Sequence, residues 1–354
     1  MNAQFTQHNL IFKQASGTSR GVLTTKETYL LEISKNGQKG IGECAIFRGL
    51  SYDDVPDYEE KLTWLCENIH SDFEVLKKEL LHYPSIIFGL EQALLNLQNG
   101  EDLYFPSDFT DGKDSIKING LIWMGNADFM QSQIEEKLAK GFDCIKLKIG
   151  VDWKSEKEII KKLREKFPKE QLELRVDANG AFSYEEARMV LQELADLGIH
   201  SIEQPIKKSE VRSPKSEENS EKKSTDCCVP WNEMAKLCAE TPTPIALDEE
   251  LIGVIDFEEK KKLLETIKPQ YIILKPALVG GFSGSDEWIV LAESLGIDWW
   301  ITSALESNIG LNAICQYTYT KKNPLPQGLG TGALFTNNFE THLQLEGDQM
   351  WHKK

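Results

Sequence analysis

The sequence predicts an α/β protein built on a parallel barrel, with a smaller α+β region before it. Short apolar strands start near residues 116, 144, 172, 200, 244, 271 and 299. The steps between them are 28, 28, 28, 44, 27 and 28 residues, which is room for one helix between successive strands. Seven such units favour a closed barrel, and spacing alone leaves a long doubly wound sheet as the alternative.

The first 112 residues carry the α+β pattern. Residues 26–34 and 40–47 alternate as strands do, and the Asn36-Gly37 pair between them predicts a hairpin turn because both residues tolerate positive φ. Apolar residues then recur at helical spacing over 56–69 and 85–98. Polar loops are expected over 15–21 and 48–54.

The one long step, 44 residues, is explained by a polar insertion at 207–228. This stretch has no apolar periodicity and mixes basic with acidic residues, so a surface loop is expected there, with a lid or docking segment as the alternative.

Composition excludes several classes of protein. The 354 residues carry 40 Lys+Arg against 56 Asp+Glu, a formal net charge of −16, which disfavours nucleic acid as a partner. No apolar run reaches the ~18 residues of a membrane span. The N-terminus lacks the basic stretch followed by an apolar stretch that is expected of a signal peptide. Seven scattered cysteines without a C-x-x-C pair fit reduced thiols, so a cytoplasmic protein is expected, and its oligomeric state stays open.

Charged residues stand at the ends of five consecutive predicted strands. In CIKLKI, LELRVD, HSIE and PIALDE the apolar residues occupy one face, and the charged residues therefore point to the barrel centre, with Asp248 rather than Glu249 facing inward. Catalytic groups of parallel barrels gather at these ends. The rim set, as we call it, consists of Lys146, Lys148, Asp177, Glu203, Asp248 and Lys275.

Three carboxylates at one rim predict a bound cation, because they repel one another when ionised. An all-oxygen ligand set suits a hard divalent ion, Mg²⁺ first and Mn²⁺ as the alternative. Lys148 and Lys275 flank the three acids, and a lysine beside a cation has a lowered pKa and can serve as a base. The chemistry this suits is removal of a proton α to a carboxylate, with the metal stabilising the developing enediolate.

These residues carry a family resemblance. The K-x-K of CIKLKIG, the VDAN of LRVDANGAF, IEQP, ALDEE and the lysine of ILKPALVGG resemble the enolase superfamily, in its muconate-lactonizing-enzyme-like branch. The resemblance implies an enolase-type modified TIM barrel, (β/α)7β, with a capping domain. It assigns residues 1–112 to the α+β cap, 113–325 to the barrel, and 326–354 to a segment that completes the barrel and returns to the cap.

Within that branch, three stretches are similar to the o-succinylbenzoate synthase family: GIGECAIFRGLSYDD, TSALESNIGL and GLGTGALF. The resemblance implies a lyase of menaquinone biosynthesis that dehydrates 2-succinyl-6-hydroxy-2,4-cyclohexadiene-1-carboxylate, a small-molecule carboxylate. Lys148 would take the α-proton and return it to the departing hydroxyl, so that the elimination is syn. Lys275 would stay cationic on the opposite face. Asp177, Glu203 and Asp248 would bind Mg²⁺.

Supporting roles follow from the same resemblance. Lys146, Asn179 and Ser303 are expected to contact the substrate carboxylate. Arg175 is expected to lie behind them and to support them without touching the substrate. The loop carrying Ser19 and Arg20, together with the loop 48–51, is expected to close the cap over the site.

Two related activities share the lysines and acids: N-acylamino-acid racemisation and dipeptide epimerisation. Dipeptide epimerases carry a D-x-D motif near the eighth strand, where this chain reads Gly330-Thr331-Gly332, and that departure disfavours a cationic dipeptide. A non-catalytic binding barrel predicts the loss of at least one member of the rim set, and all six are present.

Overall fold

The chain opens with a three-stranded antiparallel sheet in the order β1-β2-β3, formed by β1 (Asn2–Thr18), β2 (Gly21–Lys35) and β3 (Gln38–Cys44). The computed structural model describes residues 1–18, 21–123, 125, 127–208 and 231–353. Asn36 and Gly37 have φ of 53° and 82°, and Lys35 pairs with Gln38, so the predicted hairpin turn is confirmed.

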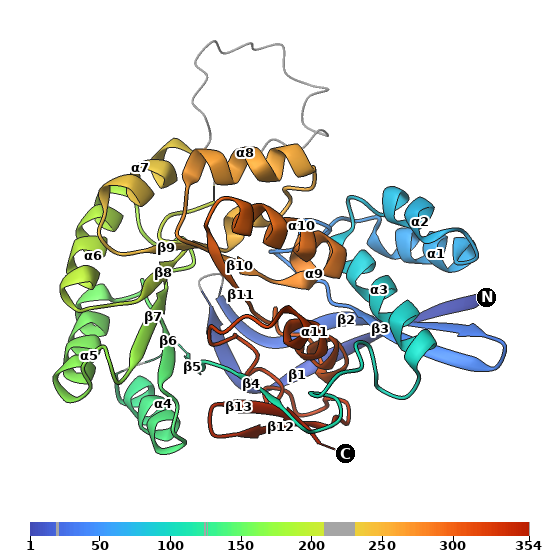
Figure 1. Cartoon of the computed structure of the whole chain (residues 1–354), viewed down its shortest axis with the longest axis horizontal. Coiled ribbons are helices and arrows are strands. Elements are labelled where there is room, and N and C mark those ends of the chain that lie inside the picture. The colour runs from blue at the N-terminus through green and yellow to red at the C-terminus, as the bar shows by residue number, and fades with distance from the viewer. Residues whose placement is uncertain (19–20, 124, 126, 209–230, 354) are drawn as a thin grey trace, which may run out of the picture.

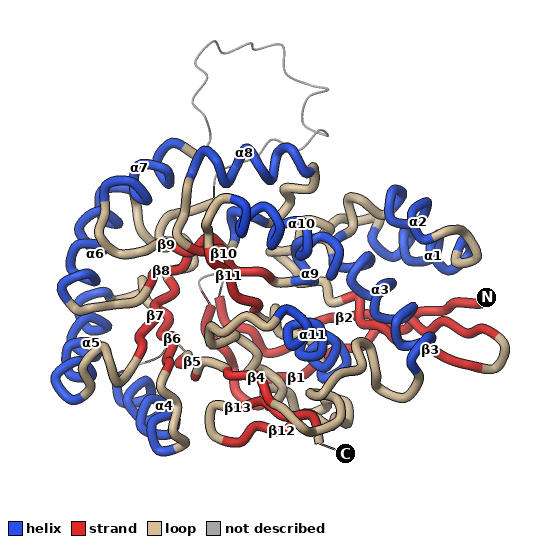
Figure 2. The backbone as a smooth tube through the Cα atoms, viewed as in Figure 1, coloured by secondary structure: helices blue, strands red, loops and turns tan. Residues whose placement is uncertain are grey.

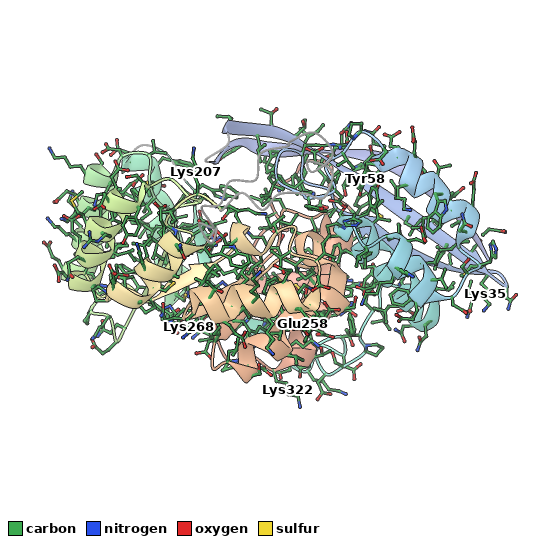
Figure 3. The ribbon with its side chains drawn as sticks, turned by 90° about the horizontal axis from the view of Figure 1, so that it is seen from above. Lys35, Tyr58, Lys207, Glu258, Lys268 and Lys322 are labelled. Carbon is green, nitrogen blue, oxygen red and sulfur yellow. The ribbon has the colours of Figure 1, made fainter. Side chains whose placement is uncertain are left out.

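Helices α1 (Tyr58–Asn68), α2 (Phe73–Glu79) and α3 (Pro84–Asn99) follow that sheet. Helix α3 packs directly on β3, because a Cβ on Gly42 would overlap the carbonyl oxygen of Gly89. The apolar faces of sheet and helices enclose a core of their own. Figure 3 shows this cap region, with Tyr58 and Lys35, on one side of the molecule and the barrel helix that carries Glu258 beside it.

A seven-stranded parallel sheet forms the second part of the molecule, in the order β11-β10-β9-β8-β7-β6-β5 (Figure 1). Its strands are β5 (Gly120–Ile122), β6 (Cys144–Lys148), β7 (Glu173–Asp177), β8 (Ser201–Glu203), β9 (Ile245–Leu247), β10 (Tyr271–Leu274) and β11 (Asp298–Ile301). Each predicted strand start from 144 to 299 is confirmed within a few residues.

Helices cover the outer face of this sheet (Figure 2). The helices of this part are α4 (Ala127–Ala139), α5 (Trp153–Lys166), α6 (Tyr184–Asp196), α7 (Asn232–Glu240), α8 (Phe257–Ile267), α9 (Pro276–Val279), α10 (Gly281–Ser294) and α11 (Asn308–Lys321). The short helix α9 packs on α3 and α10. The outward-facing strand residues, such as Leu147 and Val176, are buried against them in the largest apolar core. No helix in the described part of the chain is long and apolar enough to cross a bilayer.

Residues Gln327 and Gly328 close the barrel between its two edge strands. Gly328 forms a parallel bridge with Thr302, just after β11, and Gln327 forms one with Ile118, just before β5. The chain then runs to the cap, where Phe335 pairs with Phe12. Beyond that, β12 (Leu343–Glu346) and β13 (Gln349–His352) form a hairpin on β4 (Ser115–Lys117).

Two element predictions need correction, and two elements were not predicted. The strand expected from 116 is divided, because β4 pairs with β13 and only β5 enters the barrel. The prediction of a loop over 15–21 is wrong where the structure describes these residues, because Ala15–Thr18 continue β1 and Gly21 begins β2. Helix α2 and most of β1 were not predicted from the sequence.

Two buried carboxylates join the cap to the barrel. Glu43 on β3 accepts hydrogen bonds from the backbone N–H groups of Ser307 and Gly310, at the N-terminus of α11. Glu91 on α3 accepts them from Phe282 and Ser283, at the N-terminus of α10. Carboxylates suit helix N-termini, where free N–H groups and the helix dipole favour negative charge. We call this pair the junction carboxylates.

Candidate active site

The register of the parallel strands brings the predicted rim set together. Lys148 on β6 pairs with Asp177 on β7, and Asp177 pairs with Glu203 on β8. Asp248 and Lys275 directly follow β9 and β10. Residues at the same height on neighbouring parallel strands point to the same side, so all of them converge at the carboxyl ends of the strands.

Ion pairs link every lysine of the rim set to a carboxylate. Lys148 Nζ lies 2.9 Å from Asp177 Oδ2, and Lys146 Nζ lies 2.6 Å from Glu203 Oε2 and 3.6 Å from Asp177 Oδ2. Lys275 donates to Asp248 and lies 3.8 Å from Glu203 Oε1. All three acids are buried, with 2%, 1% and 2% of the side chains of Asp177, Glu203 and Asp248 exposed.

Burial and neighbouring charges set the pKa values of these acids in opposite directions. Burial opposes ionisation of Asp177, but the ammonium groups of Lys148, Lys146 and Lys275 outweigh it and hold the pKa of Asp177 below its usual range. Burial raises the pKa of Asp248 well above its usual range, against the pull of Lys275, and the nearby acids add to that rise.

The donor set fits a hard divalent cation. Glu203 Oε1 is buried and accepts no hydrogen bond from the described residues, which leaves a lone pair for another ligand. A cation would also offset the burial and the neighbouring acids that raise the pKa of Asp248. As placed, each acid is turned toward a lysine, and no choice of one oxygen from each of the three described carboxylates brings these oxygens within 4.8 Å of one another.

A cavity that is partly open to solvent lies over the rim. Lys148 and Lys275 both line it, together with Lys146 and Asp177. Apolar side chains and backbone form much of the remaining wall, contributed by Phe47, Leu50, Leu121, Trp123, Ala304, Leu305, Gly328 and Gly330. The cavity can hold a small molecule with an anionic end at the lysines and an apolar body against this wall.

Asn179 lies in the same cavity and positions Lys148. Its Oδ1 accepts a hydrogen bond of 2.5 Å from Lys148 Nζ, and its Nδ2 donates to Glu249 Oε1 at 3.0 Å. The sequence prediction that Asp248 rather than Glu249 faces the centre is therefore incomplete. Strand β9 ends at Leu247, and the 3₁₀ turn η2 (Glu249–Leu251) ends the strand alternation, so Glu249 lines the cavity while Asp248 pairs with Lys275.

Ser303 lines the cavity, but its hydroxyl is fully used within the protein. It donates to Glu306 Oε2 at 2.6 Å and accepts hydrogen bonds from Thr331 Oγ1 and the backbone N–H of Leu305. A hydroxyl has one hydrogen and two lone pairs, so this network employs all of them. Thr331 and Leu305 were not among the predicted site residues, and the φ of 65° at Leu305 marks a strained loop.

Arg175 lies deeper in the barrel than the rim. Its guanidinium donates to Glu173 Oε1 and to the carbonyl of Pro326, and it stacks 4.2 Å from the centre of the Trp300 ring. It therefore ties β7 to the segment that closes the barrel.

Within the predicted cap loop 48–51, a hydrophobic residue rather than the arginine reaches the cavity. Phe47 and Leu50 line the cavity, whereas Arg48 pairs with the cap's own Glu27 and Asp54. Ser19 and Arg20, for which contacts were predicted, lie outside the described residues. Residues 209–230, which make up most of the predicted insertion, lie outside them as well.

A parallel barrel whose strand ends gather lysines and carboxylates beneath a cap defines the class as an enzyme built on the enolase-type barrel. Comparison with known families agrees: the family described as enolase C-terminal domain-like matches residues 130–216, and the MenC N-terminal domain family matches residues 3–97.

Relatives define the family more closely. An o-succinylbenzoate synthase of Desulfotalea psychrophila is 42% identical, over 98% of this chain and 98% of the relative. The crystal structure of MenC from the same organism has a TM-score of 0.84 at 40% identity, covering 99% of both chains. An N-succinylamino acid racemase of Thermus thermophilus is 33% identical, over 83% of this chain and 75% of the relative.

The chain therefore belongs to the o-succinylbenzoate synthase family of the enolase superfamily, and it is a lyase of that superfamily. The predicted fold class is confirmed.

Proposed function

We propose that this protein converts 2-succinyl-6-hydroxy-2,4-cyclohexadiene-1-carboxylate to 2-succinylbenzoate, in a Mg²⁺-dependent syn-dehydration that serves menaquinone biosynthesis. The observation that carries the proposal is the pair Lys148 and Lys275 in one cavity, on strands β6 and β10 that flank the three buried acids. The relative of 42% identity, an o-succinylbenzoate synthase, supports this substrate.

Lys148 acts as the base in the proposed reaction. Its Nζ lies in the cavity between Asp177 Oδ2 and Asn179 Oδ1, which fix its direction. The amine takes the proton α to the substrate carboxylate. The same ammonium then donates that proton to the departing hydroxyl on the same face, so one residue completes both proton transfers.

Lys275 acts as a fixed cation. Burial opposes its charge, but Asp248 and Glu203 raise the pKa of Lys275 above its usual range, so it stays protonated. From β10, opposite β6, it stabilises negative charge that develops on the substrate carboxylate and ring.

Asp177, Glu203 and Asp248 would hold Mg²⁺, and Lys146 would steady the substrate carboxylate beside them. The bound ion would supply a Lewis acid for that carboxylate and stabilise the charge of the developing enediolate. The apolar wall made by Phe47 and Leu50 would exclude water from the ring.

The proposed setting is the cytoplasm. In support, the described cysteines Cys44, Cys66, Cys144, Cys238 and Cys315 are all free thiols, as expected in a reducing compartment.

The test is incubation of the purified protein with the cyclohexadiene substrate and Mg²⁺, following the diene absorbance. We expect the absorbance to disappear with Mg²⁺ and to persist after chelation with EDTA. Persistence with Mg²⁺ present would reject the proposal.

Racemisation of an N-succinylamino acid is a second candidate, because two opposed lysines can exchange protons on both faces of a carbon, and a racemase is 33% identical. Incorporation of deuterium from D₂O into N-succinylamino acids measures it. Dipeptide epimerisation is disfavoured, since Gly330 and Thr331 line the cavity where an ammonium group would require carboxylates.

A further inference from the structure

A second cluster of ligating side chains lies away from the catalytic cavity, between the cap–barrel link and the C-terminal hairpin. It consists of Asp102, after α3, His342, before β12, and His352 on β13. Asp102 Oδ2 lies 2.7 Å from His342 Nδ1 and 3.2 Å from His352 Nε2. The cluster shares no residue with the lining of the catalytic cavity.

The buried ring of His352 has an acceptor on each side. Its Nδ1 faces the carbonyl oxygen of Thr110 at 3.2 Å, and its Nε2 faces the Asp102 carboxylate. Neither oxygen can donate a hydrogen bond, and a neutral imidazole has only one N–H. With Nδ1–H donating to Thr110, the Nε2 lone pair of a neutral ring would point at a carboxylate, so either a second proton on the ring or a metal cation must lie between them.

Asp102 has unused coordinating capacity. Its Oδ1 is buried and accepts no hydrogen bond from the described residues. The side chains of Asn312 and Gln316 donate to the backbone carbonyl of Asp102, and Asn312 Nδ2 also makes a long contact of 3.5 Å with Oδ2, which fixes the segment without occupying Oδ1. The Thr110 carbonyl likewise fixes the His352 ring, as outer partners of metal-bound histidines do.

We propose that Asp102, His342 and His352 bind a divalent transition-metal ion, of which Zn²⁺ is the representative. A tetrahedral Zn²⁺ about 2.0–2.1 Å from its ligands spaces neighbouring ligand atoms about 3.3 Å apart. The separation of 3.2 Å between Asp102 and His352 is near that value, whereas the separation of 2.7 Å between Asp102 and His342 is shorter, so the His342 ring would have to move outward to admit the ion. The His342 side chain is 43% exposed, which gives an ion access and leaves a position for water.

Such an ion ties the C-terminal hairpin to the link that leads from the cap into the barrel. Two imidazoles select Zn²⁺ or Co²⁺ over Mg²⁺, which prefers oxygen ligands. The His-Asp-His cluster and the acids of the rim set can therefore be filled with different metal ions.

The test adds Zn²⁺, and in parallel Co²⁺, to the full chain in excess Mg²⁺, and compares the wild type with His342→Gln. His70→Gln is the matched control, because His70 is an exposed histidine of the cap. Elemental analysis after gel filtration counts bound zinc, and the visible spectrum of Co²⁺ reports nitrogen ligands. Thermal unfolding reports the stabilisation.

We expect one zinc per chain in the wild type and in His70→Gln, with Tm raised by about 3 °C at 100 times the Kd. His342→Gln should lose the zinc and the shift while keeping its Mg²⁺-dependent activity. Absence of bound zinc in the wild type, or an unchanged zinc content in His342→Gln, would overturn the proposal and leave a hydrogen-bonded His-Asp-His cluster.

Discussion

The acids of the rim set and the junction carboxylates are all buried, yet they are neutralised in different ways. At the rim, Asp177, Glu203 and Asp248 face lysine side chains, whose ammonium groups can turn toward another anion. At the junction, Glu43 and Glu91 face backbone N–H groups at helix N-termini. Fixed donors hold a structure together, whereas movable cations leave a site free to bind. The arrangement at the rim therefore supports function, and the arrangement at the junction supports stability.

The largest effect should come from the movable cations. We expect Lys148→Ala and Lys275→Ala each to lower kcat by about 10²–10⁴-fold, since each loses a group that acts on the reacting atoms. Steady-state kinetics by loss of diene absorbance measures this. Lys39→Ala is the control, because Lys39 forms an exposed ion pair with Glu32 on the cap. Wild-type turnover in Lys148→Ala would remove it as the base.

Replacement of a junction carboxylate should act on stability instead. Glu43→Ala removes the acceptor of Thr28, Ser307 and Gly310 and leaves the buried ammonium of Lys26 beside Glu306 alone. We expect a loss of about 3–5 kcal/mol in the free energy of unfolding, measured by urea denaturation. The exposed Glu32→Ala should stay within about 0.5 kcal/mol of wild type. Equal effects from both changes would contradict the assigned role.

Mg²⁺ should stabilise the protein through the acids of the rim set. At 100 times its Kd, Mg²⁺ should stabilise the wild type by about 2.7 kcal/mol, because it binds only the folded protein. Asp248→Asn should lose this stabilisation, whereas Asp196→Asn, at an exposed position in α6, should keep it. Calorimetry with and without Mg²⁺ measures both, and a retained response in Asp248→Asn would exclude this carboxylate as a ligand.

The smallest effect concerns pH at the junction. Burial raises the pKa of Glu91 from 4.5 to about 7, although its hydrogen bonds to Ser283 and Phe282 oppose the rise. A raised pKa means that the folded state binds the proton more tightly, so the stability contribution is complete below pH 4.5 and is lost as pH rises through 7. We expect about 1 kcal/mol to be lost between pH 6 and 8.

Glu91→Gln cannot ionise and should flatten that dependence, as urea denaturation across the pH range would measure. An unchanged slope in this variant would assign the pH dependence to another group.

The rim was predictable because its pattern is local. Strand alternation fixes the direction of Lys148 and Asp177, and the repeated βα spacing brings their strands side by side. Glu249 was missed where alternation stops at the end of β9. The hydroxyl network of Ser303 was missed because Thr331 belongs to a distant segment.

The junction was not predictable, because no local pattern relates its partners. Glu43 meets Ser307 264 residues later in the chain, and Glu91 meets Phe282 191 residues later. Only the folded chain brings these groups together. The same holds for Asp102, whose histidine partners lie 240 and 250 residues further on.

The position of Glu43 has a consequence for protein engineering. It anchors the N-terminus of α11, and the preceding loop carries Ser303, Leu305 and Glu306 beside the cavity. Cap and barrel are therefore not interchangeable modules. A chimera that takes its cap from a relative must keep a carboxylate that accepts hydrogen bonds from Ser307 and Gly310. Without it, the exchange will disturb one wall of the catalytic cavity.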